Sequence, residues 1–328
     1  MQPVRWGILG ISGHYIKKVH LPVRESEQSE VVGIASRSRE KAEATARKYD
    51  IPRAYGSYDE LLADPDIEAV YNPLPNHMHV EWVKRAADAG KHILCEKPLG
   101  LDADEVQEAI DYCRERNVLL MEAFMYRFHP QWKYARDLIH TGNIGTVRAV
   151  QSSFFYDNED PQNIRNRQDA GGGGLYDIGC YCVSTARYLL GAEPQRVVSL
   201  VEYHPEWKID MLSSGLLDFG GAHASFTVGT QNFPYQFVTA YGSGGIITVH
   251  IPFNTHPDVP VTVTVRDGID VREVAFGPED HYGAEFDAFS RAVRAGGPVP
   301  TPPEDALNNQ RVLDALFASG ESGSWVSL

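Results

Sequence analysis

Between residues 4 and 121, short apolar runs alternate with charged stretches whose apolar positions recur every three or four residues. Short apolar runs are typical of strands buried on both faces, and the longer periodic stretches are typical of amphipathic helices. The alternation predicts a doubly wound parallel sheet covered by helices on both faces. The expected strands are 4–9, 31–35, 69–71, 92–94 and 118–121, and the expected helices between them include 39–48, 79–89 and 103–116.

After about residue 144 the pattern changes to strands joined by short turns, which predicts a large, open, mostly antiparallel sheet. The expected strands are 147–155, 196–202, 214–219, 223–230, 237–241, 246–250 and 261–265, with helices at 175–190, 285–295 and 303–319. We therefore predict an α/β protein with a Rossmann-type domain at 1–122 and an α+β domain at 123–328. An open sheet leaves one broad face uncovered, so we expect a homodimer, or a dimer of dimers, that buries it.

Charge and composition exclude several classes of protein. The net charge of −14 over 328 residues repels a polyanion, so we expect no nucleic-acid partner. There is no run of about 18 apolar residues and no signal-peptide profile, which predicts a cytoplasmic protein with no membrane association. The four cysteines lack zinc-ligand spacing, so we interpret them as packed thiols and expect no metal site.

The first expected strand ends in a glycine-containing turn, Gly7-Ile8-Leu9-Gly10-Ile11-Ser12-Gly13. Glycines at this crossing let the backbone approach a pyrophosphate, and the following helix N-terminus supplies free N–H groups. The spacing departs from the strict G-x-G-x-x-G pattern, so an ordinary strand-to-helix turn stays open as an alternative. We predict cofactor contacts from Gly10, Ser12 and Gly13.

The second expected strand ends in Ile34-Ala35-Ser36-Arg37, with no acidic residue where an NAD site commonly has one. Ser36 can hydrogen-bond a 2′-phosphate and Arg37 can pair with it, whereas a carboxylate would repel it. The segment therefore predicts NADP(H) as the cofactor. A solvated arginine at a helix start is the alternative.

Three residues are candidates for the chemistry of a hydride transfer. Lys97 follows the expected strand 92–94 at its carboxyl end, where open α/β sheets bind their ligands. Pro98 keeps Lys97 out of the helical region. Asp177 and Tyr181 are four residues apart in an expected helix, so they share a face, and the four glycines before it permit a close backbone approach. Ammonium, carboxylate and phenol together can move a proton while a hydride leaves or arrives.

The chain resembles the Gfo/Idh/MocA oxidoreductase family over essentially its whole length. The resemblance rests on Glu96-Lys97-Pro98, on Asn72-Pro73-Leu74-Pro75-Asn76-His77 and on Asp177-Ile178-Gly179-x-Tyr181. It implies a catalytic set of Lys97, Asp177 and Tyr181. It also implies that the nicotinamide pocket is shaped by Pro73, Asn76, His77, Glu96 and Pro98. The first glycine loop is one residue longer than the usual form of the family.

Tyr181, the segment 121–130 and Asn163-Ile164-Arg165 are similar to the subgroup of NADP-dependent D-xylose 1-dehydrogenases and dimeric trans-dihydrodiol dehydrogenases. Arg127 and His129 leave an expected strand at its carboxyl end, so we predict them in the substrate site, with a structural role as the alternative. Phe124 and Phe155 are candidates for an apolar wall, with core packing as the alternative.

These features predict an NADP(H)-dependent oxidoreductase that acts on a CH–OH or carbonyl carbon of a small sugar, polyol or dihydrodiol. The alternative from another class is a non-catalytic NADP(H)-binding sensor or regulatory protein. A third possibility, redox-assisted glycoside cleavage, recycles a tightly held NAD and fits Ser36-Arg37 less well. The exact substrate, the physiological direction and the residue that transfers the proton, Lys97 or Tyr181, stay open.

Overall fold

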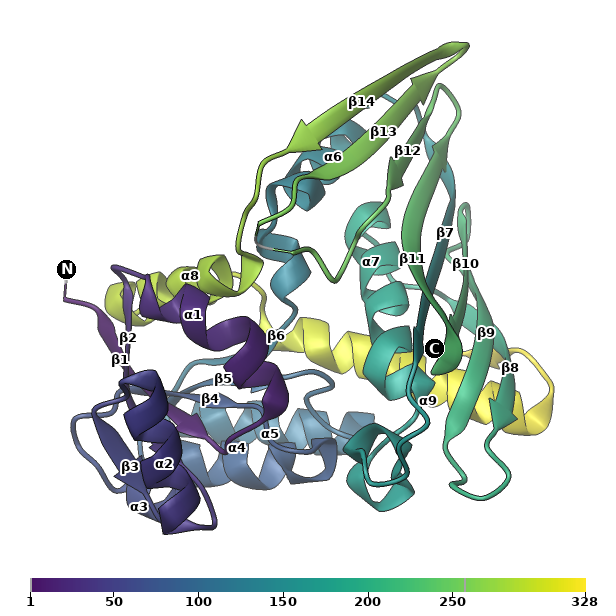
Figure 1. Cartoon of the computed structure of the whole chain (residues 1–328). Coiled ribbons are helices and arrows are strands. Elements are labelled where there is room, and N and C mark those ends of the chain that lie inside the picture. Colours follow the sequence, from purple (N-terminus) through teal and green to yellow (C-terminus); the bar gives the residue numbers. More distant parts are fainter. Residues whose placement is uncertain (1, 257) are drawn as a thin grey trace. The chain divides into compact units, whose positions relative to one another are not determined.

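The computed structural model of the chain describes residues 2–256 and 258–328 and divides into two compact units (Figure 1). The first unit holds the chain up to Met125 together with His281–Leu307. The second holds Tyr126–Asp280 and Asn308–Leu328. The sequence-based division at 122/123 stays a prediction; it assigned 281–307 to the second domain.

The first unit is built on a six-stranded sheet with the order β3-β2-β1-β4-β5-β6, in which every paired strand is parallel. This is the doubly wound arrangement that the sequence predicted. The strands are β1 Val4–Leu9, β2 Ser29–Ala35, β3 Arg53–Tyr55, β4 Ala69–Asn72, β5 His92–Glu96 and β6 Leu120–Ala123. The helices are α1 His20–Arg24, α2 Arg39–Tyr49, α3 Tyr58–Leu62, α4 His79–Asp88, α5 Ala103–Glu115 and α8 His281–Ala295, and α9 Pro303–Ser322 begins in this unit.

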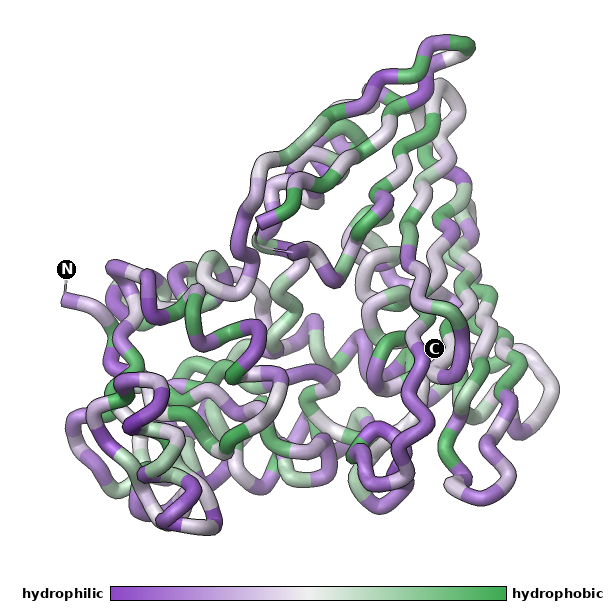
Figure 2. The backbone as a smooth tube through the Cα atoms, in the orientation of Figure 1, coloured by the Kyte–Doolittle hydropathy of each residue, from purple (hydrophilic) through white to green (hydrophobic). Residues whose placement is uncertain are grey.

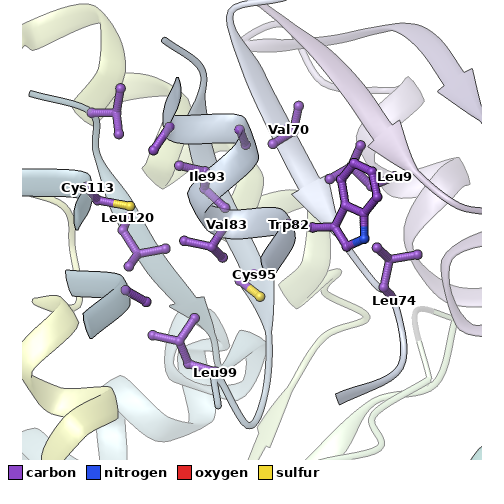
Figure 3. Packing of buried hydrophobic residues seen from close by; sticks show 14 of the residues in the cluster. Leu9, Val70, Leu74, Trp82, Val83, Ile93, Cys95, Leu99, Cys113 and Leu120 are labelled. Atoms are coloured by element: carbon purple, nitrogen blue, oxygen red, sulfur yellow. The ribbon is translucent and has the colours of Figure 1, made fainter. Parts of the chain in front are cut away.

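Side-chain caps start several of these helices. Ser38, Ser57 and Asp102 each accept a hydrogen bond from the backbone N–H three residues later, which satisfies a donor that the helix leaves unpaired. The apolar faces of α3, α4 and α5 then bury a common cluster against the sheet. Figure 3 shows part of this cluster, with Trp82 and Val83 of α4 beside Leu9, Val70 and Ile93.

Helix α8 packs with the first unit although it lies far from it in sequence. Trp6 of β1 donates its indole N–H to Ser290 at 3.1 Å and packs its ring on Phe286 and Phe289. Arg294 forms an ion pair with Glu68 at 2.6 Å. The helix therefore completes the core on the face of β1 that the α3–α5 cluster does not reach.

The second unit is built on a nine-stranded sheet with the order β14-β13-β12-β11-β7-β10-β9-β8-β15. Its strand pairs are antiparallel except β7 with β10, so the predicted mostly antiparallel sheet is confirmed. The strands are β7 Val147–Asp157, β8 Arg196–Tyr203, β9 Asp210–Asp218, β10 His223–Gly229, β11 Gln231–Gly242, β12 Ile246–Val249, β13 Val261–Asp267, β14 Asp270–Phe276 and β15 Val326–Ser327. The helices are α6 Pro130–His140 and α7 Cys180–Leu190, and α9 continues here from Asn308.

Alternating side chains give this sheet two different faces. Hydrophobic and more polar residues alternate along β13 (Figure 2), as the period of two in a strand requires. One face carries buried side chains such as Phe154, Leu217 and Phe226. The other face carries Leu200, Leu212 and Leu216, which are 78%, 39% and 37% exposed. The face opposite the core is thus partly apolar.

Several elements were missed by the sequence-based prediction. Strand β3 has three residues and helix α3 has five. Segments this short contain too few residues to show a hydrophobic periodicity. Helix α6 begins at Pro130 and is capped by His129, a start signal that is present in the sequence. The expected helix 175–190 consists of a π-helical turn, Leu175–Gly179, followed by α7.

Candidate active site

The carboxyl ends of the parallel strands bring the predicted cofactor residues to one edge of the first unit. Gly10 follows β1, Ser36 follows β2, Pro73 follows β4 and Lys97 follows β5. The strand order reverses direction between β1 and β4, and open α/β sheets bind ligands at such a switch point. The sheet therefore places these four segments where a dinucleotide binds in this architecture.

The turn after β1 has the geometry of a backbone-lined ligand site. Gly10 has φ +93°, and a Cβ there would lie 2.9 Å from Leu74 Cδ2, so a larger residue would be both strained and crowded. A Cβ on Gly13 would meet nothing within 4 Å, which leaves its backbone open. Ser12 Oγ accepts from the Tyr15 N–H at 3.0 Å at the start of a π-helical turn, Tyr15–Val19. A π turn accommodates one additional residue, as the longer loop requires, and such turns are frequent at functional sites.

The segment after β2 fits a cofactor with a 2′-phosphate. Ser36 is buried and its Oγ accepts from the Ser38 N–H at 3.2 Å, whereas Arg37 is exposed. Burial raises the pKa of the nearby Tyr58 phenol, and the Arg37 guanidinium opposes part of that rise. Hydroxyl and guanidinium without a carboxylate are a suitable donor set for a phosphate.

His79 connects the two loops that the resemblance assigns to the nicotinamide pocket. Its ring is fully buried, with Nε2 2.8 Å from the carbonyl oxygen of Leu74 and Nδ1 2.7 Å from that of Pro98. Burial lowers the pKa of His79, and the two carbonyl oxygens oppose that shift. Pro73, Asn76 and His77 lie in the first loop, and His77 is exposed. From the sequence, His77 was assigned to the pocket and His79 was missed. The histidine two residues after His77 was the sequence feature that could have identified it.

Lys97 is half-buried directly after β5, and its peptide bond to Pro98 is cis. The preceding Glu96 accepts a hydrogen bond from Tyr71 Oη at 2.5 Å and lies 3.7 Å from His14 Nε2. Glu285 of α8 is 1% exposed, and burial followed by the charge of Glu96 raises its pKa well above the usual range. Sequence reasoning missed Glu285, because nothing local marks a residue that joins a site from so far along the chain.

In the second unit, Asp177 lies in the π-helical turn and Tyr181 in the first turn of α7. Asp177 Oδ2 accepts from Arg165 Nε at 2.9 Å. Tyr181 is 6% exposed, and its ring lies 5.0 Å from that of Phe253 and 5.9 Å from that of Phe154. The helix start thus carries a carboxylate held by a cation and a phenol held among aromatic rings.

Arg165 and Tyr156 join this cluster. The charge of Asp177 is the largest cause that raises the pKa of Arg165, and Tyr156 and Tyr181 add to it. Burial, followed by Asp177, raises the pKa of Tyr156. In the sequence, Arg165 was recognised only as part of the family-like segment Asn163-Ile164-Arg165. Tyr156, which follows Phe155 on β7, was missed.

Asp210 explains part of the glycine run. Its Oδ2 accepts from the Leu175 N–H at 2.6 Å and from Ser213 Oγ at 3.0 Å, so it caps the start of the π-helical turn. A Cβ on Gly173 would lie 2.1 Å from Asp210 Oδ1. Burial raises the pKa of Asp210 to about 7. Sequence reasoning missed this residue, since its contact is set by β9.

Arg127 and His129 are held by α7 and α6. Arg127 Nη2 donates to Ser184 Oγ at 2.8 Å, and its Nε donates to Tyr126 Oη at 3.2 Å. His129 is 1% exposed and its Nδ1 accepts from the Gln131 N–H, while burial lowers its pKa to about 4. These contacts hold both side chains within the second unit, and their part in substrate binding stays a prediction.

Phe155 lies on the face of β7 opposite Phe154. It pairs with Gly229 and Tyr235, in register with the exposed Leu212 of β9. Phe154 is the buried neighbour that packs on Tyr181. The substrate contact predicted for Phe155 stays a prediction, and the structure adds Phe154 as one of the aromatic side chains beside Tyr181.

Lys97 belongs to the first unit, and Asp177 and Tyr181 belong to the second. Their joint catalytic role therefore stays a prediction. In residues 2–256 and 258–328 there is no group of three or more His, Cys, Asp or Glu side chains placed to hold a metal ion. Over the same residues, no helix has the length and apolar character needed to span a membrane.

Comparison with known families decides the assignment. Residues 4–124 match the oxidoreductase family with an NAD-binding Rossmann fold, Gfo/Idh/MocA, and residues 132–248 match the C-terminal domain of that family. The chain belongs to the Gfo/Idh/MocA oxidoreductase family. Its first unit is accordingly a nicotinamide-dinucleotide-binding Rossmann domain, and the glycine turn and the open Gly13 fit that cofactor.

Relatives within the Gfo/Idh/MocA family include sugar and dihydrodiol dehydrogenases. The chain is 40% identical to an NADP-dependent D-xylose 1-dehydrogenase of Haloferax volcanii, over 98% of this chain and 99% of that one. It is 38% identical to the trans-1,2-dihydrobenzene-1,2-diol dehydrogenase of Mus musculus, over 74% and 72% of the two chains. A 3-ketoreductase of Actinomadura kijaniata, solved with NADP and TDP-benzene, has a TM-score of 0.91 at 29% identity and covers 97% of this chain and 98% of its own. The predicted family and subgroup are confirmed.

Proposed function

We propose that this oxidoreductase uses NADP(H) to transfer a hydride to or from the CH–OH, hemiacetal or carbonyl carbon of a small sugar, polyol or dihydrodiol. The observation that carries the proposal is the position of Lys97, half-buried at the carboxyl end of β5 beside the switch point of a dinucleotide-binding sheet. The activities named for the D-xylose and dihydrodiol dehydrogenases support this substrate class.

NADP(H) is proposed over NAD(H) because of the segment after β2. Ser36 and Arg37 supply a hydroxyl and a guanidinium, and no carboxylate follows the strand to repel a 2′-phosphate. The NADP complex of the 3-ketoreductase and the cofactor in the name of the D-xylose dehydrogenase support the same preference.

Proton transfer at the substrate oxygen is assigned to this chain's own side chains. When bound, the nicotinamide accepts or supplies the hydride, so the substrate oxygen must lose or gain a proton. We assign that proton to Lys97 and Tyr181, and Asp177 to orienting the substrate. Glu96, Pro98, Pro73, Asn76 and His77 shape the pocket in this proposal.

The experiment is a substrate panel. Purified protein is supplied with NADP⁺ or NADPH and with aldoses, keto-sugars, inositols or dihydrodiols, and the change in NADPH absorbance is followed. Turnover on one of these classes supports the proposal. Absence of turnover on every class, with NADPH still bound, favours the alternative of a non-catalytic NADP(H)-binding sensor or regulatory protein.

Association is part of the same proposal. The exposed apolar side chains on the open face of the nine-stranded sheet support a homodimer built through that face. We propose a small-molecule sugar or polyol substrate as the binding partner. The cytoplasmic location expected from the sequence stays a prediction.

A further inference from the structure

The segment before the glycine run packs against those glycines. A Cβ on Gly172 would lie 2.4 Å from the carbonyl oxygen of Arg165 and 2.8 Å from that of Arg167. The Gly172 N–H donates to Arg167 O at 2.9 Å, and the Gly173 N–H donates to Arg165 O at 2.9 Å. The glycine run therefore holds residues 165–167 against the helix start, which any larger side chain would push away.

Arg165 is fixed at both ends by these contacts. Its backbone oxygen is bound to Gly173, and its side-chain Nε is bound to Asp177 Oδ2 at 2.9 Å. The side chain of Asp177 is 13% exposed and that of Arg165 is 39% exposed, so the ion pair is only partly removed from water. Such a pair is less screened than one on the surface, and the guanidinium stays in one place relative to α7.

The same guanidinium lies within electrostatic reach of two phenols. Tyr156 and Tyr181 both help to raise the pKa of Arg165, after the larger effect of Asp177. A fixed cation beside a phenol favours the ionised phenolate, whereas a carboxylate opposes it. In the second unit Arg165 thus interacts electrostatically with Asp177, Tyr156 and Tyr181. The ring neighbours of Tyr181 are Tyr126, Phe154 and Phe253.

These charges have opposite effects on Tyr181. Without Arg165, the charge of Asp177 four residues before Tyr181 would disfavour the phenolate. With Arg165 bound to Asp177, the guanidinium offsets the carboxylate and so removes most of the negative charge that would oppose ionisation of Tyr181. Ionisation of Tyr181, which proton transfer requires, therefore depends on Arg165. This residue is not one of the three assigned to the chemistry.

We propose that Arg165 is a positioning residue of the active site, which neutralises Asp177 and thereby lets Tyr181 release and regain its proton. The inference rests on the proposed function. With the cofactor bound, the nicotinamide would take the hydride in the oxidative direction. The ionised Tyr181 oxygen takes the substrate O–H proton, and the resulting phenol passes that proton to solvent before the next turnover. Arg165 acts through Asp177 and Tyr181 and leaves the atoms and electrons of that step unchanged.

The test compares Arg165→Gln, Arg165→Lys and the matched control Arg167→Gln. Arg167 is an exposed arginine of the same loop whose side chain pairs with Asp169. We expect Arg165→Gln to move the rising limb of the kcat/KM pH profile upward by about 1 to 2 pH units, as loss of a neighbouring cation does. Arg165→Lys should restore most of the shift, and Arg167→Gln should match the unmodified enzyme. The KM for NADP⁺ should change little in all three variants.

A second measurement does not need turnover. The near-ultraviolet absorbance of ionised tyrosine is titrated in the unmodified protein and in Arg165→Gln, each paired with its Tyr181→Phe partner, so that the difference reports Tyr181 alone. We expect Tyr181 to ionise at higher pH in the Arg165→Gln background. An unmoved Tyr181 titration, or a uniform loss of activity with an unmoved pH limb, would overturn the proposal.

The two failures are distinguishable. Failure of the proposed function appears as an unmodified protein without turnover on the whole panel, and the tyrosine titration still tests Arg165 in that case. An equal shift in Arg167→Gln would contradict the specific role of Arg165 and indicate a general effect of the loop.

Discussion

The Nδ1 atom of His79 lies 2.7 Å from the carbonyl oxygen of Pro98, and this contact ties the start of α4 to the loop that carries Lys97. The other ring nitrogen is 2.8 Å from the carbonyl oxygen of Leu74, in the loop after β4. A single buried side chain thus contacts both loops of the proposed nicotinamide pocket, and its loss would remove the contact that joins them.

We predict that His79→Ala lowers the free energy of unfolding by about 2 to 4 kcal/mol, because a buried side chain and its hydrogen bonds are removed together. Urea unfolding followed by circular dichroism measures the change. His223→Ala is the control, since that side chain is 68% exposed. Equal midpoints for the two variants would show that the bridge contributes nothing to stability.

Replacement of Arg37 should weaken NADP⁺ binding selectively. Arg37→Ala is expected to cost about 1 to 3 kcal/mol in NADP⁺ binding, as loss of a charge-assisted contact does, and to change NAD⁺ binding little. Fluorescence titration with both cofactors measures it, with Arg47→Ala as the control on an arginine that is 73% exposed. The assignment fails if the unmodified protein binds both cofactors equally well.

Lys97 and Tyr181 should be needed for turnover and not for cofactor binding. Lys97→Met is expected to lower kcat at least about 100-fold while NADPH still binds, and Tyr181→Phe should do so too if the phenol relays the proton. Lys84→Met, in which the ion pair with Glu108 is lost, is the control. Near-normal turnover in Lys97→Met would contradict the role of Lys97 in proton transfer.

Asp210 should make the stability of the fold depend on pH. Burial raises the pKa of Asp210 from its usual 3.8 to about 7, so the folded chain binds this proton more tightly than the unfolded chain. Stability from this group is therefore fully present below the unfolded pKa and is lost as pH rises toward about 7, with a slope of up to about 1.4 kcal/mol per pH unit.

Asp210→Asn should flatten that dependence while the amide oxygen still caps the Leu175 N–H. Urea midpoints at about pH 5 and about pH 8 give the comparison, with Asp258→Asn as the control at a side chain that is 85% exposed. A pH dependence in Asp210→Asn as steep as in the unmodified protein would contradict the assignment.

The open face of the nine-stranded sheet should form the interface of a homodimer. Leu212→Glu combined with Leu216→Glu places two charges on that face and should shift the protein toward monomer in light scattering at micromolar concentration. Ile269→Glu, at a turn residue that is 95% exposed between β13 and β14, should leave the mass unchanged. A monomeric unmodified protein would contradict the prediction directly.

The sequence by itself determined the local features. The apolar runs of β1 and β5, the glycine at position 10 and the absence of an acid after β2 are set within a few residues, and each has a direct consequence for backbone shape or charge. The parallel sheet, the mostly antiparallel second sheet and the family follow from such features, and all three are confirmed.

Tertiary structure alone decided which distant residues meet. Arg165 reaches Asp177 because Gly172 and Gly173 let the loop pack closely, and Asp210 caps the same helix start from β9. Glu285 joins the first unit because α8 packs on β1. These contacts depend on how loops and helices pack across long chain separations, and hydrophobic periodicity carries no information about that packing.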